Sequence, residues 1–116
     1  MKIVRLYADA DGESHFEDLE VEFVRTSSSG RISALEPATG VMFREVQPGY
    51  AADWHKAPRR QYVINLDAAA ELTSSDGEVR VLGPGQILLI EDTSGKGHLA
   101  RNVGDGIRSC IYVTLD

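Results

Sequence analysis

The sequence predicts a single all-β domain of the sandwich or small-barrel kind, because three features agree. Short segments rich in apolar and β-branched residues recur along the 116 residues, and several alternate apolar with polar side chains. Turn residues separate these segments at short intervals, in the stretches QPGY, SSDGE, GPGQ, TSGKG and GDG. Apolar residues make up 42% and charged residues 26% of the chain, which suits one buried core without disulfides. We therefore expect one domain over residues 1–116.

The first part of the chain predicts three strands. MKIVRLY (residues 1–7) is the first, and HFEDLEVEFV (15–24) is the second, because apolar and acidic side chains alternate in its latter half. Residues 25–40 are polar and interrupted by glycine and proline, so they predict an irregular connection. VMFREV (41–46) is the third strand.

The second part of the chain predicts six more strands. AAELTS, one of them, has the alanines of a helical turn, but it is short and strand signals flank it. Asp76-Gly77 supplies the backbone conformations of a tight hairpin turn, and the GPG stretch at 83–85 supplies a second turn. The six are QYVINL (61–66), AAELTS (69–74), EVRVL (78–82), QILLIED (86–92), GHLARNV (97–103) and RSCIYVTL (108–115).

Composition excludes several classes of function. The net charge is −6, and no basic stripe with interleaved aromatics occurs, so nucleic-acid binding is not expected. No apolar run approaches the roughly 20 residues that span a bilayer, so no membrane partner is expected. The N-terminus lacks the apolar stretch of a signal peptide, and we expect a cytoplasmic protein. Cys110 is the only cysteine and lies in an apolar run, which favours a buried thiol over a nucleophile.

Two stretches, WHKAPRRQ (54–61) and GKGHLARN (95–102), each carry one of the three histidines. Gly49 precedes His55 by six positions, and His98 precedes Asn102 by four. With these spacings the segment from Gly49 to Asn102 resembles the cupin family. The resemblance covers about half of the chain. It implies a cupin-type double-stranded β-helix, a jelly-roll barrel with both stretches in its interior.

Cupins usually hold a divalent metal with three histidines and a carboxylate. The resemblance places His55, Gln61 and His98 at three of the four ligand positions and Ala57 at the fourth. Because His55, Ala57 and Gln61 have even spacing, they share one face of an extended strand. Two imidazoles and one amide are a small ligand set for Zn, Ni, Fe or Mn. The metal is therefore either held with open coordination positions or lost.

Three other residues are candidates for the same site. Glu45 shares strand parity with Val41 and Phe43, so it is expected to face inward as a replacement carboxylate and catalytic acid or base. Arg59 shares the inward parity of His55 and could bind a substrate carboxylate. Tyr62 is assigned either to substrate contact or to packing. Asp53 and Asp92 are further carboxylates without a parity argument.

Three functions remain open from the sequence. The first is a metal-dependent enzyme that polarises a small carbonyl or organic-acid substrate, of the isomerase, cyclase, dehydratase or lyase type. The second is a metal-free module that binds or senses a small ligand. The third is a metal-independent acid–base enzyme that uses His55 or His98. We also expect a homodimer, with the first strand contributing an open sheet edge.

Overall fold

The computed structural model describes all 116 residues and contains twelve strands and no helix. The strands are β1 (Lys2–Ala8), β2 (Ser14–Glu20), β3 (Phe23–Ser27), β4 (Gly30–Ser33), β5 (Gly40–Val46), β6 (Ala51–His55), β7 (Gln61–Asn65), β8 (Ala69–Ser74), β9 (Val79–Leu82), β10 (Ile87–Glu91), β11 (His98–Val103) and β12 (Arg108–Thr114). Since no helix interrupts them, the predicted all-β class is confirmed.

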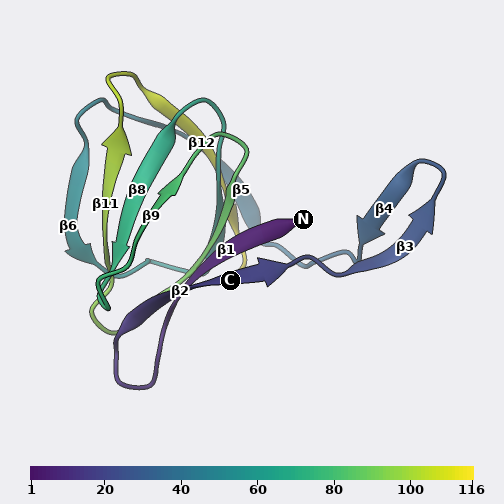
Figure 1. Cartoon of the computed structure of the whole chain (residues 1–116), viewed down its shortest axis with the longest axis horizontal. Helices are drawn as coiled ribbons and strands as arrows, with labels where there is room; N and C mark the ends of the chain where they lie inside the picture. Colours follow the sequence, from purple (N-terminus) through teal and green to yellow (C-terminus); the bar gives the residue numbers. More distant parts are fainter.

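Ten of these strands form two sheets that face each other (Figure 1). The larger sheet has the order β2-β1-β10-β7-β12-β5, and the smaller has the order β6-β11-β8-β9. Within the larger sheet β1 and β10 run parallel, while the remaining neighbours are antiparallel. Both sheets are open, so the structure is a two-layer arrangement and the expected closed barrel is not present.

The first strand is not an edge. β1 lies between β2 and β10: Lys2–Ala8 pairs with β2, and Val4–Tyr7 also pairs with β10. The expectation that MKIVRLY offers an open edge to a partner is therefore wrong. The apolar content of this strand has another cause, because Val4 and Leu6 belong to the buried core.

Residues 25–40 are not an irregular connection throughout. β3 and β4 pair with each other and with no other strand, and they extend away from the two sheets as a hairpin (Figure 1). We call residues 21–37, which include this hairpin, the arm. The predicted second strand divides at the base of the arm, since β2 ends at Glu20 and β3 begins at Phe23.

Two predictions about the smaller sheet had different outcomes. AAELTS is β8, a central strand, as its flanking strand signals indicated. The strand β6, which ends at His55, was not among the predicted strands. Its sequence, AADWH, has no apolar alternation, and four of its five residues are exposed. Such a strand leaves no hydrophobic period to detect.

The core lies between the sheets. Alternate residues of β7 point into it, so Gln61, Val63 and Asn65 are buried while the intervening residues are less so. Cys110 is 2% exposed, as predicted, and burial raises the pKa of its thiol. The buried apolar cluster consists of Val4, Leu6, Phe16, Val46, Ala57, Val63, Ala70, Leu72, Leu82, Leu88, Ile90 and Cys110.

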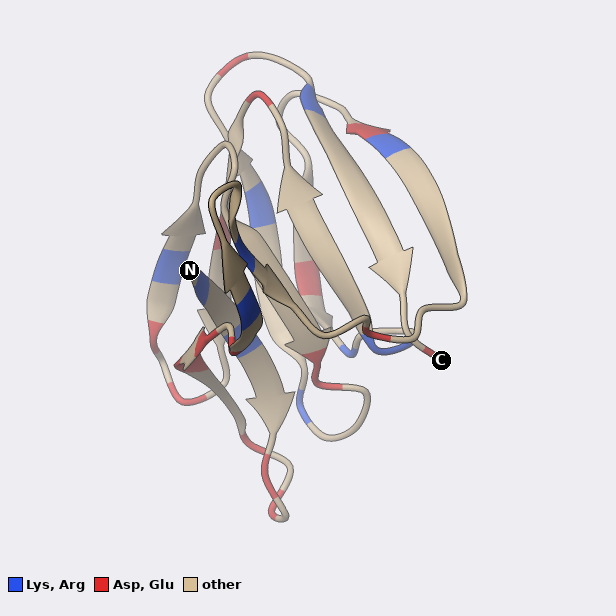
Figure 2. Ribbon diagram, turned by 90° about the vertical axis from the view of Figure 1, so that its right-hand side faces the viewer, with Lys and Arg blue, Asp and Glu red and all other residues tan.

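Charged side chains stay at the periphery. Acidic residues gather in the turn between β1 and β2, at the lower end of the view in Figure 2. Four of the nine arginines pair with carboxylates on the sheet surfaces, namely Arg5, Arg60, Arg80 and Arg101. No helix long and apolar enough to cross a membrane is present.

Candidate active site

The two histidine-bearing stretches lie side by side at the edge of the smaller sheet. β6 pairs antiparallel with β11, and His55 is the register partner of His98. The ring centroids of the two imidazoles are 4.4 Å apart. The residue before His98 must be glycine, because a Cβ on Gly97 would lie 2.0 Å from the carbonyl oxygen of His55. The glycines of the GKGH stretch therefore let the two rings approach.

His98 is fixed by a buried carboxylate. Asp92 follows β10 directly, and its Oδ2 lies 2.5 Å from Nδ1 of His98. The side chains are 0% and 4% exposed, respectively. A carboxylate accepts a hydrogen bond and cannot donate one when ionised, so the proton of the ring sits on Nδ1. In the neutral ring Nε2 is then the acceptor, and no side chain bonds to it.

His55 differs from His98 in exposure. Its Nδ1 lies 2.7 Å from the backbone carbonyl oxygen of Asp53, two residues earlier. Because a carbonyl oxygen only accepts, the ring proton is again on Nδ1. Its side chain is exposed, whereas His98 is buried. His55 thus connects the buried imidazole to solvent.

A cavity of about 290 Å³ lies between the two sheets, and both histidines line it. Ten of its seventeen lining residues are hydrophobic. The lining contains no aspartate or glutamate. The residues are Arg44, Tyr50, His55, Ala57, Pro58, Gln61, Val63, Asn65, Ala70, Leu72, Leu82, Leu88, Ile90, His98, Ala100, Arg108 and Tyr112.

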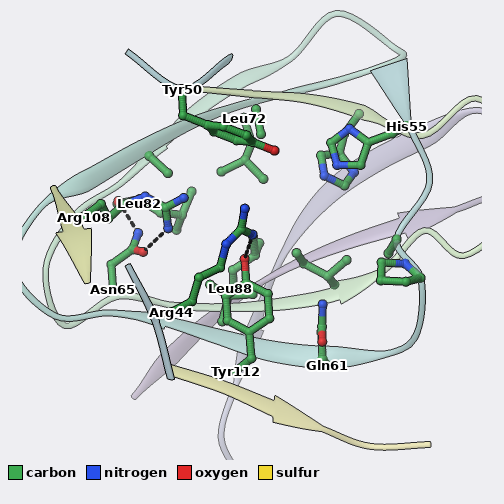
Figure 3. Close-up of a pocket in the computed structure, with 17 residues that line it drawn as sticks. Arg44, Tyr50, His55, Gln61, Asn65, Leu72, Leu82, Leu88, Arg108 and Tyr112 are labelled. Atoms are coloured by element: carbon green, nitrogen blue, oxygen red, sulfur yellow. Dashed lines mark hydrogen bonds between the residues drawn. The ribbon is translucent and has the colours of Figure 1, made fainter. Parts of the chain in front are cut away.

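Gln61 lies at the histidine end of the cavity (Figure 3). The residue is 3% exposed, and its Oε1 is buried without a hydrogen-bond partner. A buried amide without a partner costs about 1–3 kcal/mol, and native proteins rarely leave one unbonded. Its amide is therefore placed to bond a ligand in the cavity.

At the opposite end of the cavity, Arg108 is held by the amides of Asn65 and Asn102. Nε of Arg108 donates to Oδ1 of Asn102 at 2.8 Å, and Nη1 donates to Oδ1 of Asn65 at 2.7 Å. Between the two ends lies the guanidinium of Arg44, which donates to the hydroxyl of Tyr112 at 2.8 Å (Figure 3). The cavity thus has an imidazole end and a guanidinium end.

Three residues expected at the site lie elsewhere. Glu45 is exposed and absent from the cavity lining, as are Val41 and Phe43 on the same face of β5. The inward residues of this strand are Arg44 and Val46, so the assumed parity was wrong. Both faces of VMFREV carry two apolar residues, and hydrophobicity alone does not separate them.

Arg59 is exposed and does not line the cavity. It lies in the irregular stretch between β6 and β7, where the strand alternation assumed for residues 55–61 does not hold. Tyr62 points away from the cavity, and its hydroxyl donates to the carboxylate of Glu36 in the arm at 2.7 Å. Burial and this hydrogen bond raise the pKa of Tyr62 to about 12.

The sequence held weak signals for the residues that were missed. Asp92 lies two positions after the apolar run Leu88–Ile90, and a carboxylate at the end of a buried strand indicates a specific partner. Arg108 shares strand parity with Cys110, which was expected to be buried. No sequence signal marked Arg44, Asn65 or the cavity-lining tyrosines.

The donor set does not fit the metal centre that the cupin resemblance implies. No group of three or more histidine, cysteine, aspartate or glutamate side chains lies close enough to hold one metal ion. Ala57 offers no ligand atom, and the carboxylate of Asp92 bonds to His98 from outside the cavity lining. Two imidazoles and the amide of Gln61 are the only donors at this end. They do not supply the three histidines and one carboxylate of the metal centre that the resemblance implies.

Comparison with known proteins adds the fold alone. No family model matches the chain, and no curated protein matches it either. Among solved structures it is similar to SPY1581, a conserved protein of unknown function from Streptococcus pyogenes. The identity is 20%, the TM-score is 0.51, and the match covers 72% of this chain and 70% of that one. At this identity the likeness extends to the arrangement of strands and not to chemistry.

Proposed function

We propose that the protein is an enzyme that moves a proton on a small organic molecule held in the cavity, with His98 as the general base. One observation carries this proposal. The buried carboxylate of Asp92 holds Nδ1 of His98, which leaves Nε2 as a free acceptor in the cavity wall. A general base needs an unprotonated acceptor of this kind within reach of its substrate.

Asp92 is a positioning residue in this scheme. It fixes the tautomer and orientation of the His98 ring, and its negative charge stabilises the imidazolium that forms when Nε2 takes a proton. Neither task requires the carboxylate to touch the substrate, which agrees with its place behind the imidazole and outside the lining.

His55 and Gln61 complete the reactive end. The side-chain nitrogen of Gln61 makes no hydrogen bond within the chain and can donate to a carbonyl or enolate oxygen of the substrate, while the unbonded Oε1 can accept from a hydroxyl. His55, whose ring centroid is 4.4 Å from that of His98 and whose side chain is exposed, can exchange the transferred proton with water. Isomerisation, cyclisation, dehydration and β-elimination beside a carbonyl all begin with removal of a carbon-bound proton, so these reaction types share one arrangement.

The cupin resemblance supports the location of the site. Its two motifs include His55 and His98, and these two residues face each other across a strand pair. We retain cupin membership as part of the proposal. The proposed chemistry departs from the metal-dependent reaction expected from the motifs, because the ligand positions are occupied by Ala57 and Gln61.

The test is exchange of carbon-bound protons for deuterium in D2O, followed by NMR. This assay detects proton removal without knowledge of the net reaction. A panel of small carbonyl compounds, with and without carboxylate groups, is incubated with the protein. We expect exchange with at least one compound, and a loss of about 10²–10⁴-fold in His98→Asn, the range for a general base.

Asp92→Asn separates positioning from binding. It is expected to lower the exchange rate while leaving KM nearly unchanged, because Asp92 does not line the cavity. Exchange that persists in His98→Asn would contradict the proposal. Exchange that EDTA abolishes and zinc restores would also contradict it, in favour of metal-assisted chemistry.

A second candidate is binding of a small ligand without reaction. The apolar majority of the cavity lining favours it, because such pockets retain ligands by burial. In the exchange experiment this function would appear as saturable binding with no deuterium incorporation.

A further inference from the structure

Arg44 and Arg108 are the two arginines that line the cavity, and neither has a carboxylate partner. Arg25, Arg31 and Arg59 also lack one but do not line this cavity. Arg5, Arg60, Arg80 and Arg101 each pair with aspartate or glutamate. Arg108 is 6% exposed, and its hydrogen bonds go only to amide oxygens. A buried charge without a counter-charge is costly, so it calls for an anion.

The two guanidiniums lie on neighbouring strands. In the β5–β12 register Arg44 is the partner of Cys110, and Arg108 is the partner of Val46. Arg44 and Arg108 are therefore diagonal neighbours on the cavity face, with Cα atoms about 7–8 Å apart in such a pair. Their charges repel each other in the free protein, although its net charge is −6.

Their neighbours leave them available to a ligand. Only Nη1 of Arg44 is bonded, to Tyr112, and its guanidinium carbon lies 5.5 Å from the ring centre of Tyr50. Nη2 of Arg108 makes no hydrogen bond within the chain, and both residues line the cavity. Figure 3 shows the guanidinium of Arg44 between the rings of Tyr50 and Tyr112.

We propose that this pair binds a small organic carboxylate whose apolar body lies against Leu72, Leu82 and Leu88. A planar carboxylate accepts two parallel hydrogen bonds from a guanidinium, and two guanidiniums can share its oxygens. The ligand then extends from the arginine end to the imidazole end of one cavity. This inference deepens the proposed function, since it names the substrate class for His98.

Binding of benzoate and benzamide tests this assignment by calorimetric titration. The two probes match in shape and differ in charge. We expect benzoate to bind and benzamide to bind at least tenfold more weakly. Arg44→Gln is expected to weaken benzoate at least tenfold and to leave benzamide unchanged. Arg44 is exposed and lies outside the buried apolar cluster, so its replacement preserves the fold.

Lys56→Gln is the matched control, because this exposed cation follows His55 directly and does not line the cavity. It is expected to leave benzoate affinity unchanged. The assignment would be overturned by equal affinities for benzoate and benzamide or by no benzoate binding at millimolar concentration. It would also be overturned if Arg44→Gln bound benzoate as tightly as the wild type. Inorganic phosphate binding as tightly as benzoate would overturn the choice of a carboxylate.

The outcomes separate this inference from the proposed function. Carboxylates that bind through Arg44 without exchanging carbon-bound protons would uphold the carboxylate site and contradict the enzyme. Exchange confined to neutral carbonyl compounds would uphold the enzyme and contradict the carboxylate site.

The arm carries a second inference on separate observations. Its strands pair only with each other, and a two-stranded hairpin by itself is marginally stable in water. Yet it exposes apolar side chains: Leu35 is 97% exposed, Val24 62% and Ile32 53%. A groove of about 690 Å³ separates the arm from the outer face of the larger sheet, where Ile3, Ile64 and Val113 line it.

We propose that a second copy of the chain covers this groove, with the two arms exchanged. One chain carries both surfaces that the contact needs, which is the condition for a symmetric interface. Charges agree with the assignment, because the groove is lined by Glu20, Glu22 and Glu36 against one cation, Arg31, whereas the exposed Arg25 of the arm lies outside this lining. Apolar area on the arm and the sheet is then removed from water in both copies.

The oligomeric state tests this contact, measured by light scattering at micromolar concentration. We expect the wild type to be a dimer and Leu35→Asp to be a monomer. The side chain of Leu35 contacts almost nothing in one copy, so its replacement leaves the fold intact. Val81→Asp is the control, because Val81 is also exposed but lies on β9. A monomeric wild type, a dimeric Leu35→Asp, or an equal effect of Val81→Asp would overturn the proposal.

Discussion

His15 lies between two carboxylates at the end of the molecule that carries the β1–β2 turn. Nε2 lies 2.6 Å from Asp9 and Nδ1 lies 2.9 Å from Asp76. The hydrogen bond with Asp9 is the main cause that raises the pKa of His15 above 6.5. The same bond is the main cause that lowers the pKa of Asp9 below 3.8. This cluster connects the β1–β2 turn to the β8–β9 turn, far from the cavity lining.

The sign of the pH dependence follows from these shifts. Because the folded state raises the pKa of His15, its contribution to stability is complete below the ordinary pKa and is lost as pH rises through the raised value. The folded state lowers the pKa of Asp9, so the contribution of this carboxylate to stability is lost only as the pH falls below its ordinary pKa. We therefore expect the melting temperature of the wild type to exceed that of His15→Gln at pH 5–6, and the difference to shrink by pH 9. A difference that grows with pH would contradict this reading.

At the scale of single residues, sequence spacing located the imidazoles but not their partners. The spacings that resemble cupin motifs pointed to His55 and His98, and these two residues are register partners in the structure. Asp92, Arg44 and Arg108 lie outside any motif, and their roles depend on which strand face they occupy. For Arg44 that face was assigned incorrectly, because β5 is exposed along most of both sides.

At the scale of elements, the loop before β11 sets the geometry of the site. Gly95 packs against Gly12, where a Cβ would lie 2.3 Å from the backbone oxygen, and Gly97 packs against His55. Both have positive φ values, 77° and 76°, respectively. The loop can therefore lie against the β1–β2 turn and β6 only without side chains at these positions.

A pair of glycine substitutions separates crowding from backbone strain. Gly104 also has positive φ, at 90°, but a Cβ there meets nothing within 4 Å. Gly104→Ala is expected to lower the free energy of unfolding by about 1–2 kcal/mol through strain alone. Gly97→Ala is expected to cost clearly more and to remove the NMR contacts between His55 and His98. Urea unfolding measures both, and equal losses would contradict the crowding argument.

Every strand with at least one buried residue was predicted, and the three strands without one were not predicted as strands of their own. β7 and β8 alternate against the core and β10 carries three consecutive buried residues, and all three were predicted with nearly their observed bounds. β3, β4 and β6 are mostly exposed, so their sequences lack the period that marks a half-buried strand. The apolar residues Val24, Ile32 and Leu35 of the arm are exposed, so no buried face gives the arm a periodic pattern.

At the scale of the whole molecule, the two open sheets enclose one cavity with opposite chemical characters at its ends. One end presents two imidazoles and an unbonded amide, and the other presents the guanidinium of Arg108. The guanidinium of Arg44 lies between the ends, and neither arginine has a counter-charge. The apolar walls between them set the size and hydrophobicity of the ligand. An organic carboxylate anchored at one end would present its reactive carbon to His98 at the other.

The most direct measurement for this account is the ¹⁵N NMR spectrum of the histidine rings. The bond between Asp92 and His98 predicts that the proton of the neutral His98 ring resides on Nδ1 and that Nε2 is bare. Asp92→Asn should weaken this preference, and benzoate should shift the Nε2 resonance in the wild type. A proton found on Nε2 of the neutral His98 ring would contradict the account, because His98 would then offer no acceptor to the cavity.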